Sequence, residues 1–141
     1  MFKVDGNSLV QLNKLSKGNM LEHLGIVFTE FTSTCLKATM PVDHRTKQPF
    51  GLLHGGASVV LAETLGSVAA NFAVENPLAE TAVGVEINAN HIKSATNGNV
   101  TGHCTPIRIG RNIHVYEIKI YNEQEELICV SRLTVAIVRR K

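Results

Sequence analysis

The sequence predicts an α+β fold in which a curved antiparallel sheet wraps one long helix. The segment 55–75 is rich in alanine and apolar on nearly every side, with Gly55-Gly56 in front and Asn76-Pro77 behind, which is typical of a buried helix. Four runs with strand character follow this segment, and a hairpin precedes it. Strands that adjoin in the chain around one helix favour an antiparallel sheet packed on that helix.

The elements before the long helix are predicted to be short. Ser8 is expected to cap an amphipathic turn that Gly18 ends, and residues 19–24 suggest a second short turn. The apolar period then changes to two, and a polar turn separates residues 25–31 from residues 36–40. This pattern predicts a hairpin of two strands.

The second half of the chain is predicted to be all strand. Asn97-Gly98 and the polar segments at 110–112 and 122–125 have the composition of turns. They divide this part of the chain into four consecutive antiparallel strands, predicted at about 81–94, 100–109, 113–121 and 127–138.

Length and charge limit the class of protein. A chain of 141 residues without an internal repeat or a Pro/Ser linker predicts one domain over residues 1–141. Its 14 basic and 12 acidic side chains are interspersed, so the net charge of +2 does not suggest a nucleic-acid binder. No segment approaches the roughly 20 apolar residues of a membrane span, and the N-terminus lacks the layout of a signal peptide. We therefore expect a cytoplasmic protein that binds neither nucleic acid nor membranes.

The cysteine and histidine patterns predict no metal site. Cys35, Cys104 and Cys129 are far apart and form no C-x-x-C pair, so we expect three buried thiols. The 6 histidines show no H-x-x-x-H pair on a helix and no carboxylate at ligand spacing.

Polar residues form one stripe on the apolar helix. Glu63, Ser67 and Asn71 are spaced by four residues and therefore share a face. One interpretation is that this stripe is the solvent-facing edge of a packed helix. The other is that Glu63 faces a cleft or a subunit interface, because no Lys or Arg lies three or four residues away to neutralise it. A carboxylate that is desolvated in such a place has a raised pKa, which suits base catalysis.

The start of the helix offers hydrogen-bond donors for a negative charge. His54-Gly55-Gly56 leaves backbone N–H groups unpaired at the positive end of the helix dipole, without a Cβ to block a ligand, which suits a developing oxyanion. Gln48, in the preceding loop, adds an uncharged amide donor. An ordinary loop-to-helix junction with an exposed Gln is the alternative interpretation.

The distance between Gly55 and Glu63 limits how the two residues can act together. At a rise of 1.5 Å per residue they lie about 12 Å apart along the helix, too far for both to act on one carbonyl group. If both are functional, they come from different chains. Two antiparallel copies of the helix about a two-fold axis would place Gly55 of one chain beside Glu63 of the other, so the spacing predicts an obligate dimer.

Two segments carry a family resemblance. The motif QPFGLLHGGASVVLAETLGS and the downstream VGVEINANHIKSA resemble the hotdog-fold acyl-CoA thioesterases, in the branch that includes phenylacetic-acid-pathway thioesterases and 1,4-dihydroxy-2-naphthoyl-CoA hydrolases. The resemblance extends from about Asn19 to Ile137. It implies a central helix wrapped by strands, a continuous sheet across two subunits, and a homodimer that commonly assembles further into a homotetramer.

The resemblance also implies roles for the residues of the motif. Glu63 would act as nucleophile or general base, and the Gly55 N–H would be the main oxyanion donor with Gln48 as a second polarising group. His54 would orient the thioester, and Ser67 would help to hold the attacking water. Glu63 and Ser67 would come from the subunit opposite the other three residues.

For the CoA portion of the substrate, the resemblance points to three parts of the chain. No cofactor is implied, because CoA belongs to the substrate and the product. The cations in these parts are Lys93, Arg108 and Arg111. We expect at least one of them to be an ordinary surface charge, while the others bind the phosphates of CoA. The implied CoA-binding residues are Gly84, the segment His91-Ile92-Lys93-Ser94, and the stretch 108–113 with Arg108, Gly110 and Arg111.

The expected reaction is hydrolysis of a thioester to a carboxylic acid and free CoA. The motif favours an aroyl group such as 1,4-dihydroxy-2-naphthoyl, which would place the enzyme in menaquinone biosynthesis; a medium-chain acyl group and a carrier-protein thioester are alternatives. A hotdog dehydratase or hydratase would carry a spaced Asp and His, whereas Asp43 and His44 are adjacent. A non-catalytic acyl-CoA sensor would usually add a DNA-binding segment, for which the first 24 residues are too short and too weakly basic.

Overall fold

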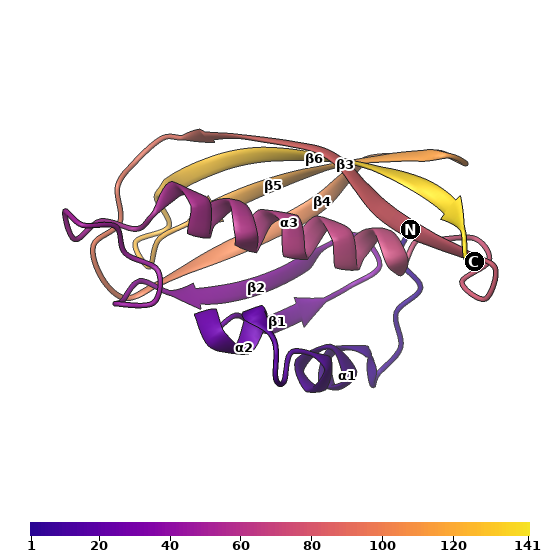
Figure 1. Cartoon of the computed structure of the whole chain (residues 1–141), viewed down its shortest axis with the longest axis horizontal. Helices are drawn as coiled ribbons and strands as arrows, with labels where there is room; N and C mark the ends of the chain where they lie inside the picture. Colours follow the sequence, from indigo (N-terminus) through magenta and orange to yellow (C-terminus); the bar gives the residue numbers. More distant parts are fainter.

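The computed structural model describes all 141 residues, and its α+β architecture confirms the predicted fold class (Figure 1). A 6-stranded antiparallel sheet curves around one long helix, and two short helices lie beside the first strand. The helices are α1 (Ser8–Leu15), α2 (Met20–Leu24) and α3 (Gly55–Asn71). The strands are β1 (Val27–Phe31), β2 (Leu36–Pro41), β3 (Glu80–His91), β4 (Asn99–Ile109), β5 (Ile113–Tyr121) and β6 (Leu127–Arg139).

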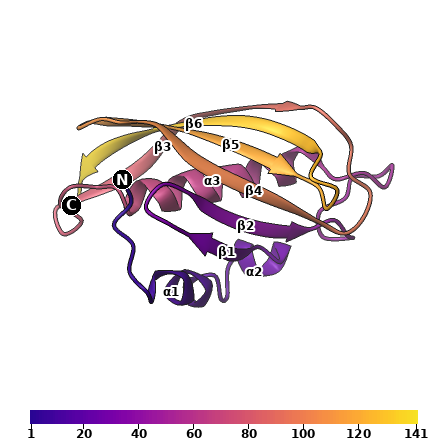
Figure 2. The ribbon, with the colours of Figure 1, turned by 180° about the vertical axis from the view of Figure 1, so that it is seen from behind.

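The order of the strands in the sheet differs from their order in the chain. The sheet runs β1-β2-β4-β5-β6-β3, so β3 lies at an edge beside β6 and does not pair with β4 (Figure 2). The chain bends at Asn97-Gly98 as predicted, but the strands on either side of this turn are not neighbours, because the connection from β3 to β4 passes β6 and β5. The place beside β4 is taken by β2, whose Leu36, Ala38 and Met40 are fully buried.

Helix α3 lies very close to the sheet. A Cβ atom on Gly66 would lie 2.5 Å from Cδ2 of Leu133 on β6, and a Cβ atom on Gly102 of β4 would lie 2.5 Å from Cδ1 of Leu65. Leu65 and Leu133 are both fully buried. Because neither glycine has room for a side chain, the two positions set the distance between α3 and the sheet.

Helix α3 is shorter than predicted and ends at Asn71. The carbonyl of Phe72, just past the helix, accepts the backbone N–H of Lys3 at 2.8 Å, and the Lys3 ammonium donates to the carbonyls of Val74 and Glu75. The N-terminal segment thus takes up the acceptors at the end of the helix. Composition alone predicted helix as far as Glu75 because residues 72–75 carry no helix-breaking residue.

The N-terminal helices form as predicted, although one cap is different. The N-cap of α1 is Asn7, and Ser8 is the first helical residue. The Ser8 hydroxyl donates to the carboxylate of Asp5 at 3.0 Å and accepts the Asp5 N–H, so it closes the turn before the helix and does not cap it. Asn19 caps α2 by accepting the N–H of Leu21 at 3.1 Å.

The three cysteines are free thiols, but only two of them are buried. Cys104 and Cys129 are fully buried, and desolvation raises the pKa of both thiols. Cys35 is partly exposed just before β2, which corrects the prediction of three buried thiols. None of the helices has the length and the apolar character that crossing a bilayer requires.

Candidate active site

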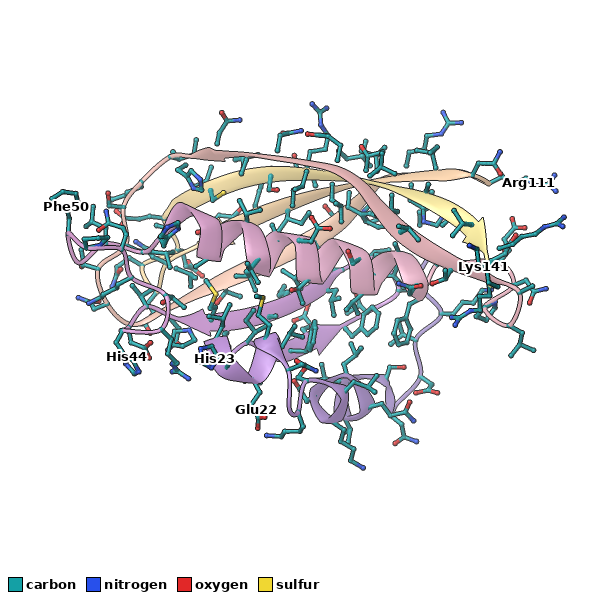
Figure 3. The ribbon with its side chains drawn as sticks, viewed as in Figure 1. Glu22, His23, His44, Phe50, Arg111 and Lys141 are labelled. Carbon is teal, nitrogen blue, oxygen red and sulfur yellow. The ribbon has the colours of Figure 1, made fainter.

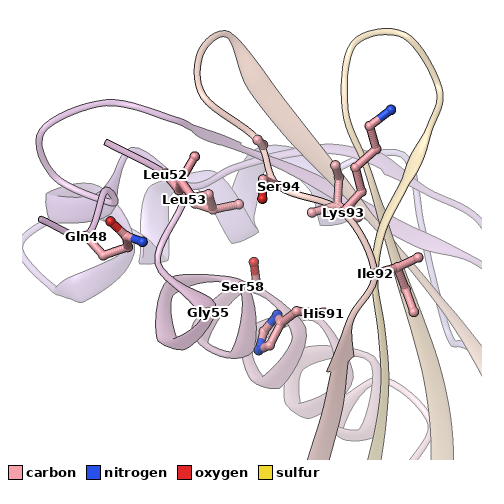
Figure 4. A pocket seen from close by; sticks show the side chains of 11 residues that line it. Gln48, Leu52, Leu53, Gly55, Ser58, His91, Ile92, Lys93 and Ser94 are labelled. Atoms are coloured by element: carbon pink, nitrogen blue, oxygen red, sulfur yellow. The ribbon is translucent and has the colours of Figure 1, made fainter. Parts of the chain in front are cut away.

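A cavity of about 260 Å³ lies at the N-terminal end of α3 (Figure 4). The loop before α3 forms one wall, the first turn of α3 forms the floor, and the segment after β3 forms the opposite wall. Six of the predicted site residues, from three separate parts of the chain, meet here. They are Gln48, Gly55 and the segment 91–94. The lining residues are Gln48, Leu52, Leu53, Gly55, Ser58, His91, Ile92, Lys93, Ser94, Ala95 and Ile128.

The backbone N–H of Gly55 is an unpaired donor in this cavity. His54 is the N-cap of α3, and its ring nitrogen Nδ1 accepts the N–H of Gly56 at 2.8 Å. The N–H of Gly55 has no acceptor in the chain, because residues of the first helical turn have no partner within the helix. A Cβ atom on Gly55 would lie 2.7 Å from Nε2 of His91, so the His91 ring covers this residue closely. A side chain at position 55 would therefore require the His91 ring to move.

The side chain of Gln48 is held in one orientation by its own loop. Its Oε1 accepts the N–H of Phe50, and its backbone N–H donates to the carbonyl of Leu52 at 2.8 Å. Gly51 has a φ of 80°, a conformation that favours glycine and permits this tight loop. Because the oxygen of the amide is occupied, the NH₂ group remains free, and Figure 4 shows the amide nitrogen on the cavity side. The site therefore holds two uncharged donors.

His54 lies apart from this cavity. Its exposed ring lines a second hollow, between α2 and the first turn of α3, together with Met20, Leu24 and Arg45. Its Nδ1 is an acceptor for Gly56, so the neutral ring carries its proton on Nε2. In one chain, His54 acts on the helix terminus and does not line the cavity that contains Gln48.

The polar stripe of α3 faces strand β3. Glu63 is half-buried, and its carboxylate forms no ion pair or hydrogen bond in the chain. A Cβ atom on Gly84 would lie 2.6 Å from Oε1 of Glu63. Asn71, at the end of the stripe, accepts from Thr81 Oγ1 at 3.0 Å and from the N–H of Ala82 at 3.1 Å. The stripe is therefore more than a solvent-facing edge. Asn71 anchors α3 to β3, while Glu63 remains unpaired.

Residues 50–129 match the family model of the thioesterase superfamily. The chain belongs to this family. It is 52% identical over 131 residues to the 1,4-dihydroxy-2-naphthoyl-CoA hydrolase of Escherichia coli (strain K12), covering 93% of this chain and 95% of the relative. It is 50% identical over 131 residues to the proofreading thioesterase EntH of Cronobacter sakazakii, covering 93% and 94%.

Solved structures agree with this assignment. A thioesterase of Haemophilus influenzae superposes with a TM-score of 0.92 at 48% identity, covering 98% of this chain and 94% of that one. A Gln-to-Ala variant of a Pseudomonas aeruginosa thioesterase superposes with a TM-score of 0.94 at 43% identity, covering 99% of both chains. The chain is thus a hotdog-fold thioesterase, and it is a thioester hydrolase.

Most of the residues predicted to bind CoA lie at two opposite ends of the thioesterase molecule. The segment 91–94 lines the cavity, but Lys93 Nζ pairs with Glu126 at 2.6 Å, and this hydrogen bond, helped by Asn122, holds the pKa of Glu126 below its usual value. Arg111 lies at the other end of the molecule, as its distance from Phe50 in Figure 3 shows, and it forms no ion pair. Gly84 lies against Glu63, between the two ends.

Sequence reasoning missed several residues that line the cavity. Leu52, Leu53, Ala95 and Ile128 form its apolar walls, and Ile128 is brought there by pairing, since its carbonyl accepts the N–H of Ile92 at 2.7 Å. Nothing in the linear sequence indicates that contact. Ser58 could have been found, because it follows Gly55 by three residues and therefore shares its helix face.

Proposed function

We propose that this thioesterase hydrolyses acyl-CoA thioesters, preferably those of aromatic acids, to the free acid and CoA. The observation that carries the proposal is the unpaired N–H of Gly55, which shares one cavity with the free amide of Gln48. The name of one relative, a 1,4-dihydroxy-2-naphthoyl-CoA hydrolase, supports a CoA thioester of an aromatic acid. A role in menaquinone biosynthesis follows if the acyl group is the same.

The two donors stabilise the charge that develops on the thioester oxygen. When the carbonyl carbon is attacked, its oxygen becomes an oxyanion, and fixed donors at that position lower the barrier because they need no reorganisation. The Gly55 N–H lies at the positive end of the α3 dipole, which adds to the effect. Gln48 contributes a dipole without a positive charge, so it does not trap the carboxylate product.

Glu63 supplies the attacking group, and it comes from a second chain. Within one chain Glu63 lies about 12 Å along α3 from Gly55 and does not line the cavity. Glu63 either attacks the carbonyl carbon directly to form a mixed anhydride or removes a proton from the attacking water. In both routes the CoA thiolate leaves and takes up a proton. In the first route, water then hydrolyses the anhydride, which releases the acid and restores the carboxylate of Glu63. Ser67, one turn further along α3, helps to hold the water, and His54 orients the helix terminus that binds the thioester.

The smallest active unit that we propose is a homodimer. Strand β3 lies at the edge of the sheet with no partner on its outer side, and Val83 and Val85 are exposed there. Such an edge favours pairing with a second copy. A two-fold axis at β3 would continue the sheet and set the α3 helices antiparallel, with Glu63 of each chain near Gly55 of the other. Further assembly into a homotetramer is part of the proposal.

The same axis brings the CoA-binding residues together. The turn between β4 and β5 lies at the end of the molecule opposite the cavity (Figure 1). In an antiparallel dimer, this turn of one chain approaches the cavity of the other. Arg108 and Arg111 form no ion pair in the chain, so they are free to bind phosphates, whereas the charge of Lys93 is satisfied by Glu126. Of the three cations, Lys93 is therefore the one we assign to structure.

A dehydratase mechanism is not supported at the loop before α3. Asp43 accepts from Arg45 at 2.7 Å, and this interaction lowers the pKa of Asp43 to about 2. An acid held ionised in that way is a poor proton donor at neutral pH. The unpaired carboxylate of Glu63 also favours a catalytic protein over a sensor that only binds acyl-CoA.

The test is thiol release from benzoyl-CoA, straight-chain acyl-CoA and acyl-carrier-protein thioesters. We expect the wild-type enzyme to prefer the aroyl-CoA and the Glu63→Gln variant to lose about 10²–10⁴-fold in kcat, the range for a positioned base. Glu75→Gln, a change of an exposed glutamate outside the site, is the matched control and should keep wild-type kcat. Full activity of the Glu63→Gln enzyme would contradict the mechanism, and equal rates on all thioesters would contradict the substrate class.

A further inference from the structure

One buried hydroxyl in the cavity has no partner. Ser58 lies on the first turn of α3, three residues after Gly55, and is 1% exposed. Its Oγ forms no hydrogen bond. Every polar side-chain atom that is fully enclosed in the chain has a partner, so the Ser58 Oγ is not fully enclosed. The Ser58 Oγ must therefore reach open space, and the open space beside it is the cavity. Figure 4 shows the hydroxyl pointing away from the helix into this cavity.

The other buried serines are all paired. The Ser16 hydroxyl donates to the carbonyl of Leu12 at 3.0 Å, the Ser131 hydroxyl donates to the carbonyl of Asn88 at 2.8 Å, and Ser8 is bonded to Asp5. A helical serine commonly donates back to the carbonyl four residues earlier. Ser58 does not do so. Because serine is a weaker helix former than alanine and an unpaired buried hydroxyl lowers stability, folding alone does not explain Ser58.

We propose that Ser58 is a substrate-binding residue that hydrogen-bonds a polar group next to the thioester. This inference rests on the proposed function, because it places the thioester carbonyl at the Gly55 N–H. Residues three apart on a helix are neighbours, with about 5–6 Å between their Cβ atoms, so the Ser58 hydroxyl reaches groups a few bonds from that carbonyl. The bonded group is part of the substrate and is not the reacting atom.

Two polar groups of a thioester substrate lie at this distance. One is the amide of the cysteamine unit of CoA, close to the sulfur, and the other is a hydroxyl on the aromatic ring next to the carbonyl. A serine hydroxyl can donate and accept, so it matches either group. A site built to hydrogen-bond a substrate group discriminates against the analogue that lacks it, because the hydroxyl is then left unpaired. Ser58 therefore contributes to substrate specificity.

The experiment compares Ser58→Ala with Ser131→Ala on four thioesters. These are benzoyl-CoA, 2-hydroxybenzoyl-CoA, the benzoyl thioester of N-acetylcysteamine, and the benzoyl thioester of propanethiol, which has no amide. We expect Ser58→Ala to lower kcat/KM by about tenfold wherever the bonded group is present. A loss on every thioester except that of propanethiol identifies the amide, and a loss only on 2-hydroxybenzoyl-CoA identifies the ring hydroxyl.

Thermal unfolding separates this role from a structural one. Ser58→Ala removes no hydrogen bond, so its melting temperature should be no lower than that of the wild type. Ser131→Ala loses the hydrogen bond to the carbonyl of Asn88, so its melting temperature should be lower. Its ratios of kcat/KM between the four thioesters should be those of the wild type. An unchanged kcat/KM on all four thioesters would overturn the proposal. An equal loss on all four would overturn it too, because the propanethiol thioester has neither the amide nor the ring hydroxyl. Wild-type and Glu63→Gln rates in the same assay test the proposed function separately.

Discussion

Each donor in the cavity is free because a neighbouring group is occupied. His54 takes the N–H of Gly56, which leaves that of Gly55 as the available donor at the helix terminus. The N–H of Phe50 fixes the oxygen of the Gln48 amide, which leaves the NH₂ group without a partner in the chain. The local hydrogen bonds thus prepare the site before any ligand binds, which is the condition for electrostatic stabilisation of an oxyanion.

Two substitutions of Gln48 test this arrangement. Gln48→Ala removes one oxyanion donor and should lower kcat by about 10²–10³-fold. Gln48→Glu keeps the size of the side chain but places a negative charge beside the developing oxyanion, so its kcat should be lower still. Steady-state kinetics with benzoyl-CoA give the comparison. If the Glu variant is as active as wild type or more active than the Ala variant, Gln48 does not face the oxyanion.

A buried histidine should make stability depend on pH. His114 is buried, its Nδ1 lies 3.0 Å from the hydroxyl of Tyr116, and burial lowers its pKa below 6.5. The folded protein therefore binds fewer protons than the unfolded chain as pH falls through 6.5, and the free energy of unfolding decreases by at most about 1.4 kcal/mol per pH unit for one such group.

Replacing His114 should weaken this dependence. Urea unfolding of His114→Gln between pH 7.5 and pH 5 should show a shallower loss of stability than wild type, with a residual slope from His103, whose pKa is also lowered by burial. His44→Gln, at an exposed position, should keep the wild-type slope. Identical slopes in all three proteins would mean that His114 does not titrate in this range.

At the scale of elements, α3 is placed by what its ends and its small residues contact. Its N-terminus is capped by His54, and the carbonyls after its C-terminus are bound by Lys3. Between these ends, Gly66 lets the helix approach β6, as Gly102 lets β4 approach the helix. The position of the Gly55 N–H therefore depends on contacts along the whole helix.

Gly66→Ala should destabilise the fold. A Cβ atom at this position would lie 2.5 Å from Leu133 Cδ2 in a fully buried contact, and overpacking of this kind costs about 1–3 kcal/mol. Urea unfolding at fixed protein concentration measures the change. Gly6→Ala is the matched control, because a Cβ atom at Gly6 meets nothing within 4 Å. Equal free energies of unfolding for the two variants would show that α3 shifts to accommodate the added methyl group.

At the scale of the whole molecule, the residues proposed for the site lie at opposite ends of the molecule. The cavity with Gly55 lies at one end, Arg111 at the other, and Glu63 between them. The two-fold arrangement that we propose would unite these parts, so activity should require residues from both subunits.

Mixing two inactive variants tests this requirement. Gln48→Ala and Glu63→Gln, unfolded together and refolded as an equal mixture, should form mixed dimers in half of the population. One site of each mixed dimer carries no substitution, so activity should return to about a quarter of the wild-type value. Each variant refolded alone is the control. No recovery above the two controls would place Gln48 and Glu63 of one chain in the same site.

Local patterns in the sequence predict most of the helices and strands, and they single out the residues proposed for the site. Periodicity located α3 and the strands because a buried helix and a half-buried strand leave different apolar patterns. The four-residue spacing of Glu63 and Ser67, and the glycines after His54, predict the chemistry that we propose, because both arrangements are local. Two predictions about helix ends were wrong: Ser8 does not cap α1, and α3 ends at Asn71 and not at Glu75.

Which distant residues meet depends on how the strands pair in the folded chain. A turn signal such as Asn97-Gly98 says that the chain bends, but it does not say that β3 pairs with β6 and β4 with β2. The contact of His91 with Gly55 and the place of Ile128 in the cavity follow from that pairing. The same holds for the unpaired hydroxyl of Ser58, because whether a buried polar group finds a partner depends on packing between elements and not on sequence spacing.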